Sequence, residues 1–252
     1  MNKLAIFFVF LFLISCKTKR EIISESSIKP TKLVDYFDSV RNRKVPVAFY
    51  YKESLAFTKM PVVIFSHGYG RNDPKSYLTY NFLLGNLAQA GYFVVSVQHE
   101  LATDDFVPLE GKPQVVRRPN WDRGAENIAF ILNELKKDFT KLDYQKVTIA
   151  GHSNGGDMSV LFADQHPELV WKLITLDHRR YPFPRISKPQ IYSLRSSDQP
   201  ADEGVLPTLE EQKKLGMTMV KLPNTIHNDM DESGTLEQKT EILNYFLKFL
   251  KE

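Results

Sequence analysis

Short apolar runs alternate with segments of helical spacing along most of the chain. The runs that predict strands are residues 45–51, 61–65, 92–97, 146–150, 172–176, 190–194 and 217–222. The segments that predict helices are residues 78–90, 126–137, 157–165, 208–215 and 235–250. Continuous apolar strands that alternate with helices are typical of a mostly parallel sheet with helices on both faces. The pattern therefore predicts one α/β domain.

The composition excludes several classes of protein but does not indicate a function. The 252 residues are 42% hydrophobic and 25% charged, which fits a globular chain and excludes wholesale disorder. The formal net charge of +3 is too small for a nucleic-acid-binding surface, and no zinc-finger or RNA-binding motif is present. A single cysteine excludes an intramolecular disulfide framework and a multi-cysteine metal cluster.

The N-terminus has the pattern of an export signal. Lys3 precedes an uninterrupted apolar run over residues 4–14, which is too short to span a bilayer as a mature helix. The sequence Leu-Ile-Ser-Cys at residues 13–16 resembles the lipobox of bacterial lipoproteins, in which cleavage before the cysteine leaves its thiol to carry lipid. The alternative is a plain secretory signal with an incidental cysteine. Because Cys16 is the only cysteine and a polar segment follows it, the lipoprotein is favoured.

This interpretation divides the chain into three regions. Residues 1–15 are a signal peptide, residues 16–32 are a lipidated flexible tether, and residues 33–252 are the folded domain. The mature protein is then an exported bacterial lipoprotein. Its acyl chains hold it to a membrane, where it faces the periplasm or the cell surface.

A candidate nucleophile lies between an expected strand and an expected helix. Residues 151–155 read Gly-His-Ser-Asn-Gly, which satisfies the G-x-S-x-G pattern of a nucleophile elbow. The chain must reverse there within a few residues, and the flanking glycines avoid a clash with neighbouring backbone. Ser153 is therefore the candidate nucleophile. The backbone N–H of Asn154, at the start of the helix, is a candidate donor to a developing oxyanion.

A second oxyanion donor is expected after the strand at residues 61–65. Residues 66–70 read Ser-His-Gly-Tyr-Gly, and Tyr69 is the residue expected to donate its backbone N–H. The two glycines let the backbone approach a substrate. His67 is expected to be a structural hydrogen-bonding residue rather than a catalyst.

His227 is the candidate general base, chosen by elimination among six histidines. Folds with such an elbow place the serine first, then the acid, then the histidine. His227 follows the last expected strand, in the loop before the final helix. His166 would lie about 20 Å from Ser153 along the elbow helix, at ~1.5 Å per residue. His178 stands next to a candidate acid.

Two aspartates remain open as the third member of this set. Asp177 ends the strand after the elbow helix, and Asp198 follows the next strand. The spacing of Asp198 and His227 is typical of the commonest arrangement in such folds, whereas a minority use the position of Asp177. The residues alone leave the two candidates nearly equal.

Four collinear motifs add a resemblance. They are VVIFSHGYG at residues 62–70, GYFVVSVQH at residues 91–99, GHSNGG at residues 151–156, and Leu176-Asp177 followed by Pro182. Together they resemble the platelet-activating-factor acetylhydrolase family of α/β-hydrolases, over roughly residues 38–250. Dienelactone-hydrolase-like proteins and bacterial polyester hydrolases are similar too. The resemblance implies an α/β-hydrolase fold and esterase activity.

The resemblance also bears on the acid. The acetylhydrolases imply Asp177, whereas the polyester hydrolases imply Asp198. Because the first match is longer, Asp177 is ranked first. His178-Arg179-Arg180 replaces the more apolar residues usual after that Leu-Asp pair, so an inherited substrate preference does not follow.

These observations predict a serine hydrolase that cleaves small-molecule carboxylic esters through an acyl-enzyme, without a metal or cofactor. Residues 178–189 leave little room for a large cap, so the stretch 99–121 is the expected wall of the pocket. Four arginines near these loops would suit an anionic group, although such side chains are more often solvated: Arg117, Arg118, Arg179 and Arg180. The alternative function is a catalytically silent α/β-hydrolase-fold lipoprotein that binds a ligand or partner. The intact serine, histidine and acid set argues against it.

Overall fold

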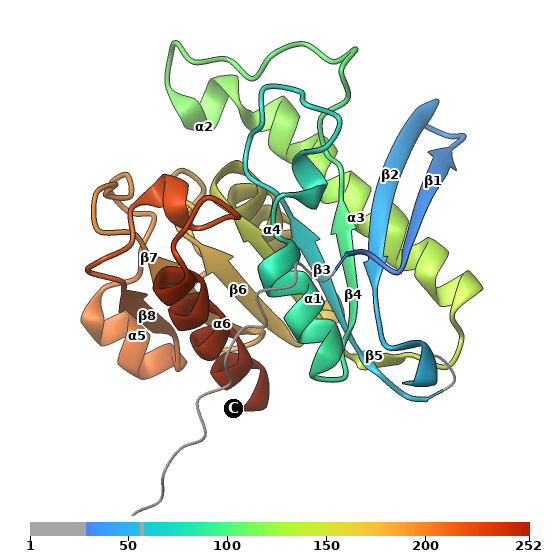
Figure 1. The fold of residues 1–252 in the computed structure, drawn as a ribbon. Coiled ribbons are helices and arrows are strands. Elements are labelled where there is room, and N and C mark those ends of the chain that lie inside the picture. Colours follow the sequence, from blue (N-terminus) through green and yellow to red (C-terminus); the bar gives the residue numbers. More distant parts are fainter. Residues whose placement is uncertain (1–28, 56–57) are drawn as a thin grey trace, which may run out of the picture.

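An eight-stranded sheet organises the part of the chain that the computed structural model describes, residues 29–55 and 58–252. The strand order is β1-β2-β4-β3-β5-β6-β7-β8 (Figure 1). The strands are β1 (Lys32–Asp38), β2 (Arg43–Tyr50), β3 (Pro61–Ser66), β4 (Phe93–Val97), β5 (Asp143–His152), β6 (Lys172–Leu176), β7 (Gln190–Arg195) and β8 (Thr218–Lys221). β1 and β2 are antiparallel to their neighbours, and all pairs from β4 to β8 are parallel.

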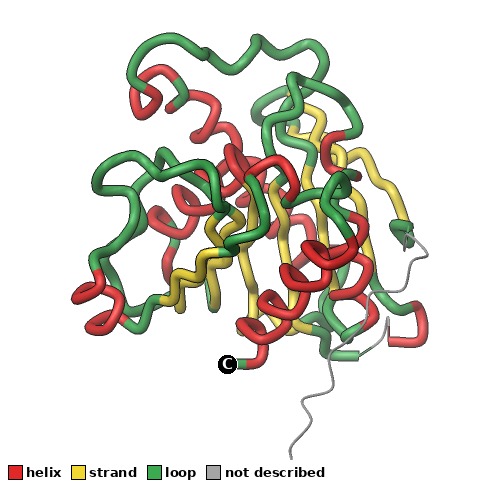
Figure 2. Tube along the Cα trace, turned by 60° about the vertical axis from the view of Figure 1, so that its left-hand side comes forward, coloured by secondary structure: helices red, strands yellow, loops and turns green. Residues whose placement is uncertain are grey.

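Helices cover both faces of the sheet (Figure 2). They are α1 (Asn81–Gln89), α2 (Pro113–Val116), α3 (Arg118–Asp138), α4 (Ser153–Gln165), α5 (Leu209–Leu215) and α6 (Leu236–Lys251). Alternate residues of β3 enter opposite cores, as the two-residue period of a strand requires. Val62 and Ile64 pack with residues of α3 and α4, whereas Val63 and Phe65 pack with residues of α1 and α6. The predicted parallel α/β sheet with two covered faces is confirmed.

Two elements differ from the sequence expectation. β1 was not expected, because it is a largely exposed edge strand that lacks an apolar run. The stretch 99–121, expected to be a loop wall, contains α2 and the first turn of α3. Its prolines were misleading because Pro113 and Pro119 stand in the first turns of α2 and α3, where a missing N–H costs nothing.

The carboxyl ends of the parallel strands meet at one edge of the sheet. β5 and β6 end at His152 and Leu176, which are paired in register, and Leu176 is in turn paired with Leu194 of β7. The segment that carries α2 lies beyond this edge (Figure 1). Residues 178–189 form neither helix nor strand, so β6 and β7 are joined without a cap helix. This edge is therefore open to the loops that follow the strands.

The expected signal peptide, Cys16 and most of the expected tether lie outside the described residues. β1 begins at Lys32, one residue before the expected start of the folded domain at residue 33. None of the helices in the described ranges has the length and apolar character needed to cross a bilayer.

Candidate active site

Ser153 stands on a sharp turn between β5 and α4. β5 ends at His152, α4 begins at Ser153, and the serine has a positive φ of 52°. Such a backbone costs free energy and is found where surrounding structure enforces it. A Cβ on Gly155 would lie 2.2 Å from the His67 carbonyl oxygen, and one on Gly151 would lie 2.5 Å from the Gly155 oxygen. The two glycines are therefore required for the turn that presents the Ser153 hydroxyl.

His227 brings its imidazole to this hydroxyl. It begins a short 3₁₀ helix, His227–Asp229, in the loop between β8 and α6. Its Nε2 lies 2.9 Å from Ser153 Oγ, and its Nδ1 lies 2.6 Å from Asp177 Oδ2. Because a carboxylate accepts a hydrogen bond, the proton of the neutral ring is on Nδ1 and Nε2 is free to accept the serine proton.

Asp177 is a buried and fully bonded carboxylate at the end of β6. It is 0% exposed and accepts hydrogen bonds from the backbone N–H of Ser196 (3.0 Å) and from the hydroxyl of Ser196 (2.7 Å). Nη2 of Arg195 lies 2.9 Å from Asp177 Oδ1. Burial raises the pKa of this carboxyl. The partners outweigh burial and bring the pKa down to about 2; they are the hydrogen bond from His227, the charge of Arg195 and the hydrogen bonds from Ser196. Asp177 is therefore an anion beside the imidazole at every physiological pH.

Asp198 contacts His227 at a different atom. Its Oδ1 accepts a hydrogen bond of 2.8 Å from the backbone N–H of His227, and its side chain is exposed. The structure thus brings Ser153, His227 and Asp177 together through their side chains. Asp198 instead holds the backbone of the loop that carries the histidine.

The two expected oxyanion donors belong to segments that lie close to the serine. The Asn154 N–H belongs to the first turn of α4, where backbone N–H groups have no intrahelical partner. The loop after β3 passes close by, since a Cβ on Gly68 would lie 3.5 Å from Ser153 Cβ. The Gly68 N–H is occupied by the Tyr80 hydroxyl at 3.0 Å, whereas the Tyr69 N–H has no acceptor among the described residues. The Tyr69 hydroxyl accepts from the Val107 N–H at 3.1 Å, which ties this loop to the segment before α2.

Sequence reasoning missed the role of His152 and Tyr80. The Tyr80 hydroxyl accepts from Gly68 and lies 2.7 Å from His152 Nδ1, so its own proton is donated to that nitrogen. Burial, and secondarily the nearby His227, lower the pKa of His152 to about 3, so this ring is neutral. His152, which stands between Gly151 and Ser153 in the motif, thus links the elbow through Tyr80 to the loop after β3. The motif leaves this position unspecified, and Tyr80 is remote from it in the sequence.

The remaining candidates have other partners. His67 and His178 are buried and bonded to Gly68 O and Thr175 Oγ1, as a structural role requires. Among the arginines, Arg118 pairs with Asp122, Arg180 pairs with Asp202, and the Arg117 Nε donates to a backbone carbonyl. Arg179 is partly buried, without a side-chain partner in the described part of the chain. No group of three or more His, Cys, Asp or Glu side chains within the described ranges is arranged to hold a metal ion.

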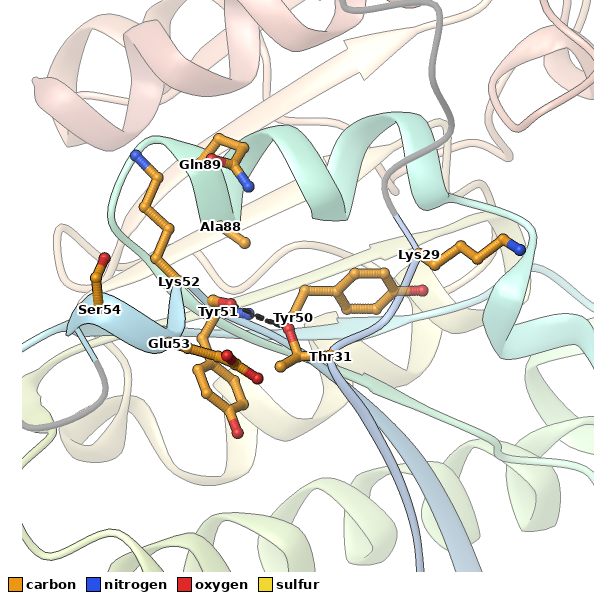
Figure 3. A pocket seen from close by; sticks show the side chains of 9 residues that line it. All are labelled: Lys29, Thr31, Tyr50, Tyr51, Lys52, Glu53, Ser54, Ala88 and Gln89. Atoms are coloured by element: carbon orange, nitrogen blue, oxygen red, sulfur yellow. Dashed lines mark hydrogen bonds between the residues drawn. The ribbon is translucent and has the colours of Figure 1, made fainter.

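A pocket of about 490 Å³ lies away from this site (Figure 3). It is lined by residues 29, 31 and 50–54 and by the end of α1. β2 runs antiparallel to β4, so its last residue, Tyr50, pairs with Val94 near the amino end of that strand. The pocket is therefore at the edge of the sheet opposite Ser153 and does not belong to the candidate active site.

Solved structures with a similar fold are esterases. A fungal esterase from Rhizomucor miehei matches with a TM-score of 0.68 and 14% identity, over 90% of this chain and 84% of its own. A thermophilic esterase from Thermogutta terrifontis, Est2 with butyrate bound, matches with a TM-score of 0.61 and 12% identity, over 86% of this chain and 94% of its own. Esterase 2 of the same organism, phosphoramylated by tabun, matches with a TM-score of 0.60 and 12% identity, over 88% of this chain and 96% of its own. No family model and no curated protein matches the sequence.

These likenesses identify the class of fold. The mostly parallel eight-stranded sheet of the described residues, its helices on both faces and the elbow after β5 define an α/β-hydrolase fold. The fold class expected from the sequence is confirmed.

Proposed function

We propose that the protein is a serine hydrolase that cleaves carboxylic esters through a Ser153–His227–Asp177 triad. One observation carries this proposal. An unbroken chain of hydrogen bonds runs from a buried carboxylate through an imidazole to a serine hydroxyl on a strained turn. These are the geometry and the roles by which such triads are recognised on unrelated folds.

Each residue then has a defined step. Ser153 Oγ attacks the ester carbonyl while its proton passes to His227 Nε2, and Asp177 stabilises the resulting imidazolium. The backbone N–H groups of Tyr69 and Asn154 bind the oxyanion. The bond to the alcohol oxygen breaks as the imidazolium returns its proton to that oxygen. Water then attacks the acyl-enzyme in the same way and gives a proton to His227 Nε2. As the bond between the acyl group and Ser153 Oγ breaks, Nε2 passes that proton to Ser153, and the acid leaves.

The similar structures support ester hydrolysis without fixing the substrate. The Thermogutta terrifontis esterase holds butyrate in one structure and is phosphoramylated by tabun in another. The four sequence motifs favour kinship with the acetylhydrolase-like α/β-hydrolases, whose acid position matches Asp177. The short β6–β7 connection favours esters that reach an uncapped site.

A fluorophosphonate probe tests the proposal. Wild-type protein should be labelled at Ser153, and Ser153→Ala should not be labelled. Ser233→Ala is the matched control, since Ser233 is an exposed serine of the loop after His227 and its variant should label like the wild type. Folded wild-type protein that neither labels nor hydrolyses any member of an ester panel would favour the alternative, a silent fold that binds a ligand or partner.

We also propose that the protein is exported and anchored through lipid on Cys16. The lipobox-like residues 13–16 and the short apolar run before them support this proposal. In a bacterial host, wild-type protein should partition into detergent and incorporate labelled palmitate, whereas Cys16→Ala should do neither. A wild-type protein that is exported without lipid would instead establish the plain secretory signal.

A further inference from the structure

Glu100 is a buried carboxyl that the triad does not use. It follows β4 at the carboxyl edge of the sheet and is 1% exposed. Its Oε1 accepts a hydrogen bond of 3.2 Å from Asn154 Nδ2. Asn154 Oδ1 in turn accepts from Trp121 Nε1 at 2.9 Å. The side chain of Asn154 is therefore clamped from both ends, and its backbone N–H is one of the two oxyanion donors.

The second oxygen of Glu100 faces the loop that carries the other donor. Oε2 lies 3.7 Å from His67 Nε2, which accepts a hydrogen bond of 3.1 Å from the His99 backbone N–H. The ring proton of His67 is therefore on Nδ1, which donates to the Gly68 carbonyl oxygen at 2.7 Å. That carbonyl belongs to the same peptide group as the Tyr69 N–H. The hydrogen bond thus fixes the plane of the Tyr69 donor and polarises it.

A neutral carboxyl fits this position. Burial raises the pKa of Glu100, and the nearby charge of Arg123 opposes that effect only in part. Oε2 is buried and has no hydrogen-bond partner within the described ranges. His67 Nε2 already accepts from the His99 N–H and lies 3.7 Å from Oε2, so a proton on Oε2 reduces the repulsion between these two acceptor atoms. A negative charge here would instead lie behind both donors and oppose the oxyanion.

We propose that Glu100 is a positioning residue that holds the side chain of Asn154 and, through it, the oxyanion donor at the start of α4. Donors fixed before the reaction do not have to reorganise as charge develops, and this preorganisation lowers the barrier. Glu100 touches neither the serine nor the histidine of the triad, and it acts through Asn154. The inference rests on the proposed ester hydrolase function.

Two substitutions at residue 100 separate hydrogen bonding from charge. Glu100→Leu keeps much of the volume and loses the hydrogen bond to Asn154, so kcat should fall about tenfold to a hundredfold, less than the 10²–10³ that removal of a donor costs. KM should stay within about threefold, because the donors act on the transition state more than on the bound ester. Glu100→Gln can still accept from Asn154 with its amide oxygen, so it should retain at least about a third of kcat.

A transition-state analogue gives a readout that general damage to the fold would not produce. A trifluoromethyl ketone, which forms an oxyanion adduct with a catalytic serine, should bind Glu100→Leu more weakly by the same factor as kcat/KM falls. Asp143→Leu is the matched control. It removes a buried carboxyl at the opposite edge of the sheet, with 8% exposure, and should leave kcat and analogue affinity within about twofold.

The outcomes separate the inference from the proposed function. Wild-type protein that neither labels nor turns over would overturn the proposed function and the inference with it. If the wild type is active but Glu100→Leu keeps kcat within twofold, or if Glu100→Gln is as slow as Glu100→Leu, the inference alone is overturned. Should Glu100→Leu fail to fold by circular dichroism, Asn154→Ala decides, because it keeps the backbone donor and should show the same selective loss of kcat. An active, folded Asn154→Ala with unchanged kcat would overturn the inference.

Discussion

Asp177 and Asp198 both bind His227, yet they bind different parts of it. Asp177 lies at the end of β6, fully buried, with its two oxygens bonded to His227, Ser196 and Arg195. Asp198 lies in the exposed loop after β7 and holds only the backbone N–H of the histidine. The difference shows that proximity to the base does not define the acid of a triad. The acid is the carboxylate that reaches the ring nitrogen and is kept ionised there.

The largest expected effect is at Asp177. Asp177→Asn keeps the shape of the side chain but can present an N–H to His227 Nδ1, which favours the wrong tautomer and leaves no acceptor for the serine proton. We expect kcat to fall by about 10⁴ with KM little changed. Steady-state hydrolysis of an activated ester by purified, folded variant measures this. A loss smaller than about tenfold would remove Asp177 from the triad.

The strands and the turn that carry the site could be predicted from the sequence, whereas the contacts between its side chains could not. Apolar runs predicted seven strands that the structure contains, β2 to β8, and six of these lie in the parallel part of the sheet, where strands are covered on both faces. The glycines around Ser153 marked the elbow. The choice between Asp177 and Asp198 could not follow from pattern, because β6 and β7 are neighbours and both deliver an aspartate to the same edge. What decides is the positive φ of Asp177, 52°, and the bonds that the start of the next loop makes to it.

The polar contacts behind the two oxyanion loops could not be predicted from the sequence pattern either. Tyr80, His152 and Glu100 act through single contacts across the fold, and none of them lies in a motif that specifies its partner. The edge strand β1 was missed for a related reason, because its residues are mostly exposed and lack an apolar run. Tertiary contacts, rather than local periodicity, place these groups.

The next largest expected effect is a loss of stability on replacing Arg195, the cation beside Asp177. Arg195 is 8% exposed, and its guanidinium bonds Asp177 Oδ1 and the His178 carbonyl. Arg195→Met would leave a buried carboxylate without its ion pair, which typically costs about 3–5 kcal/mol of stability. Urea unfolding at pH 7 measures the change in the free energy of unfolding. A loss below about 1 kcal/mol would mean that Ser196 and His227 suffice to hold the charge.

A third carboxyl sharpens the comparison because it is buried without a close ion pair. Asp157 Oδ1 accepts from the backbone N–H groups of Arg180 (2.9 Å) and Tyr181 (2.8 Å). Burial raises its pKa from 3.8 to about 6, since these hydrogen bonds and the charge of Arg180 only partly compensate. Asp177 and Asp157 are both buried, and the partners of both lower the pKa. Only the partners of Asp177 outweigh burial, so the net shifts of the two pKa values have opposite signs.

The sign of the pH effect follows from this raised pKa. The folded state binds the proton more tightly than the unfolded state, so the contribution of Asp157 is fully present below about pH 4 and is lost as pH rises through 6. The shift corresponds to about 3 kcal/mol. Asp157→Asn can accept the same two hydrogen bonds and never ionises. Its stability relative to the wild type should therefore rise by about 2 kcal/mol between pH 4 and pH 7.5, measured by urea unfolding. A difference that does not change with pH would contradict the assignment.

The smallest expected effect is at Asp198, and it tests the other half of the comparison. Asp198→Asn retains an oxygen that can accept from the His227 N–H, so kcat should stay within about threefold of the wild type. Asp198→Ala loses that bond, but the exposed position limits the cost to less than about 1 kcal/mol of stability. Because the side chain of Asp198 does not reach the imidazole, the pH profile of kcat/KM should be the same in all three proteins. A loss of more than a hundredfold in Asp198→Asn, with Asp177→Asn active, would exchange the roles of the two aspartates, since only a carboxylate that orients the ring can affect proton transfer to that extent.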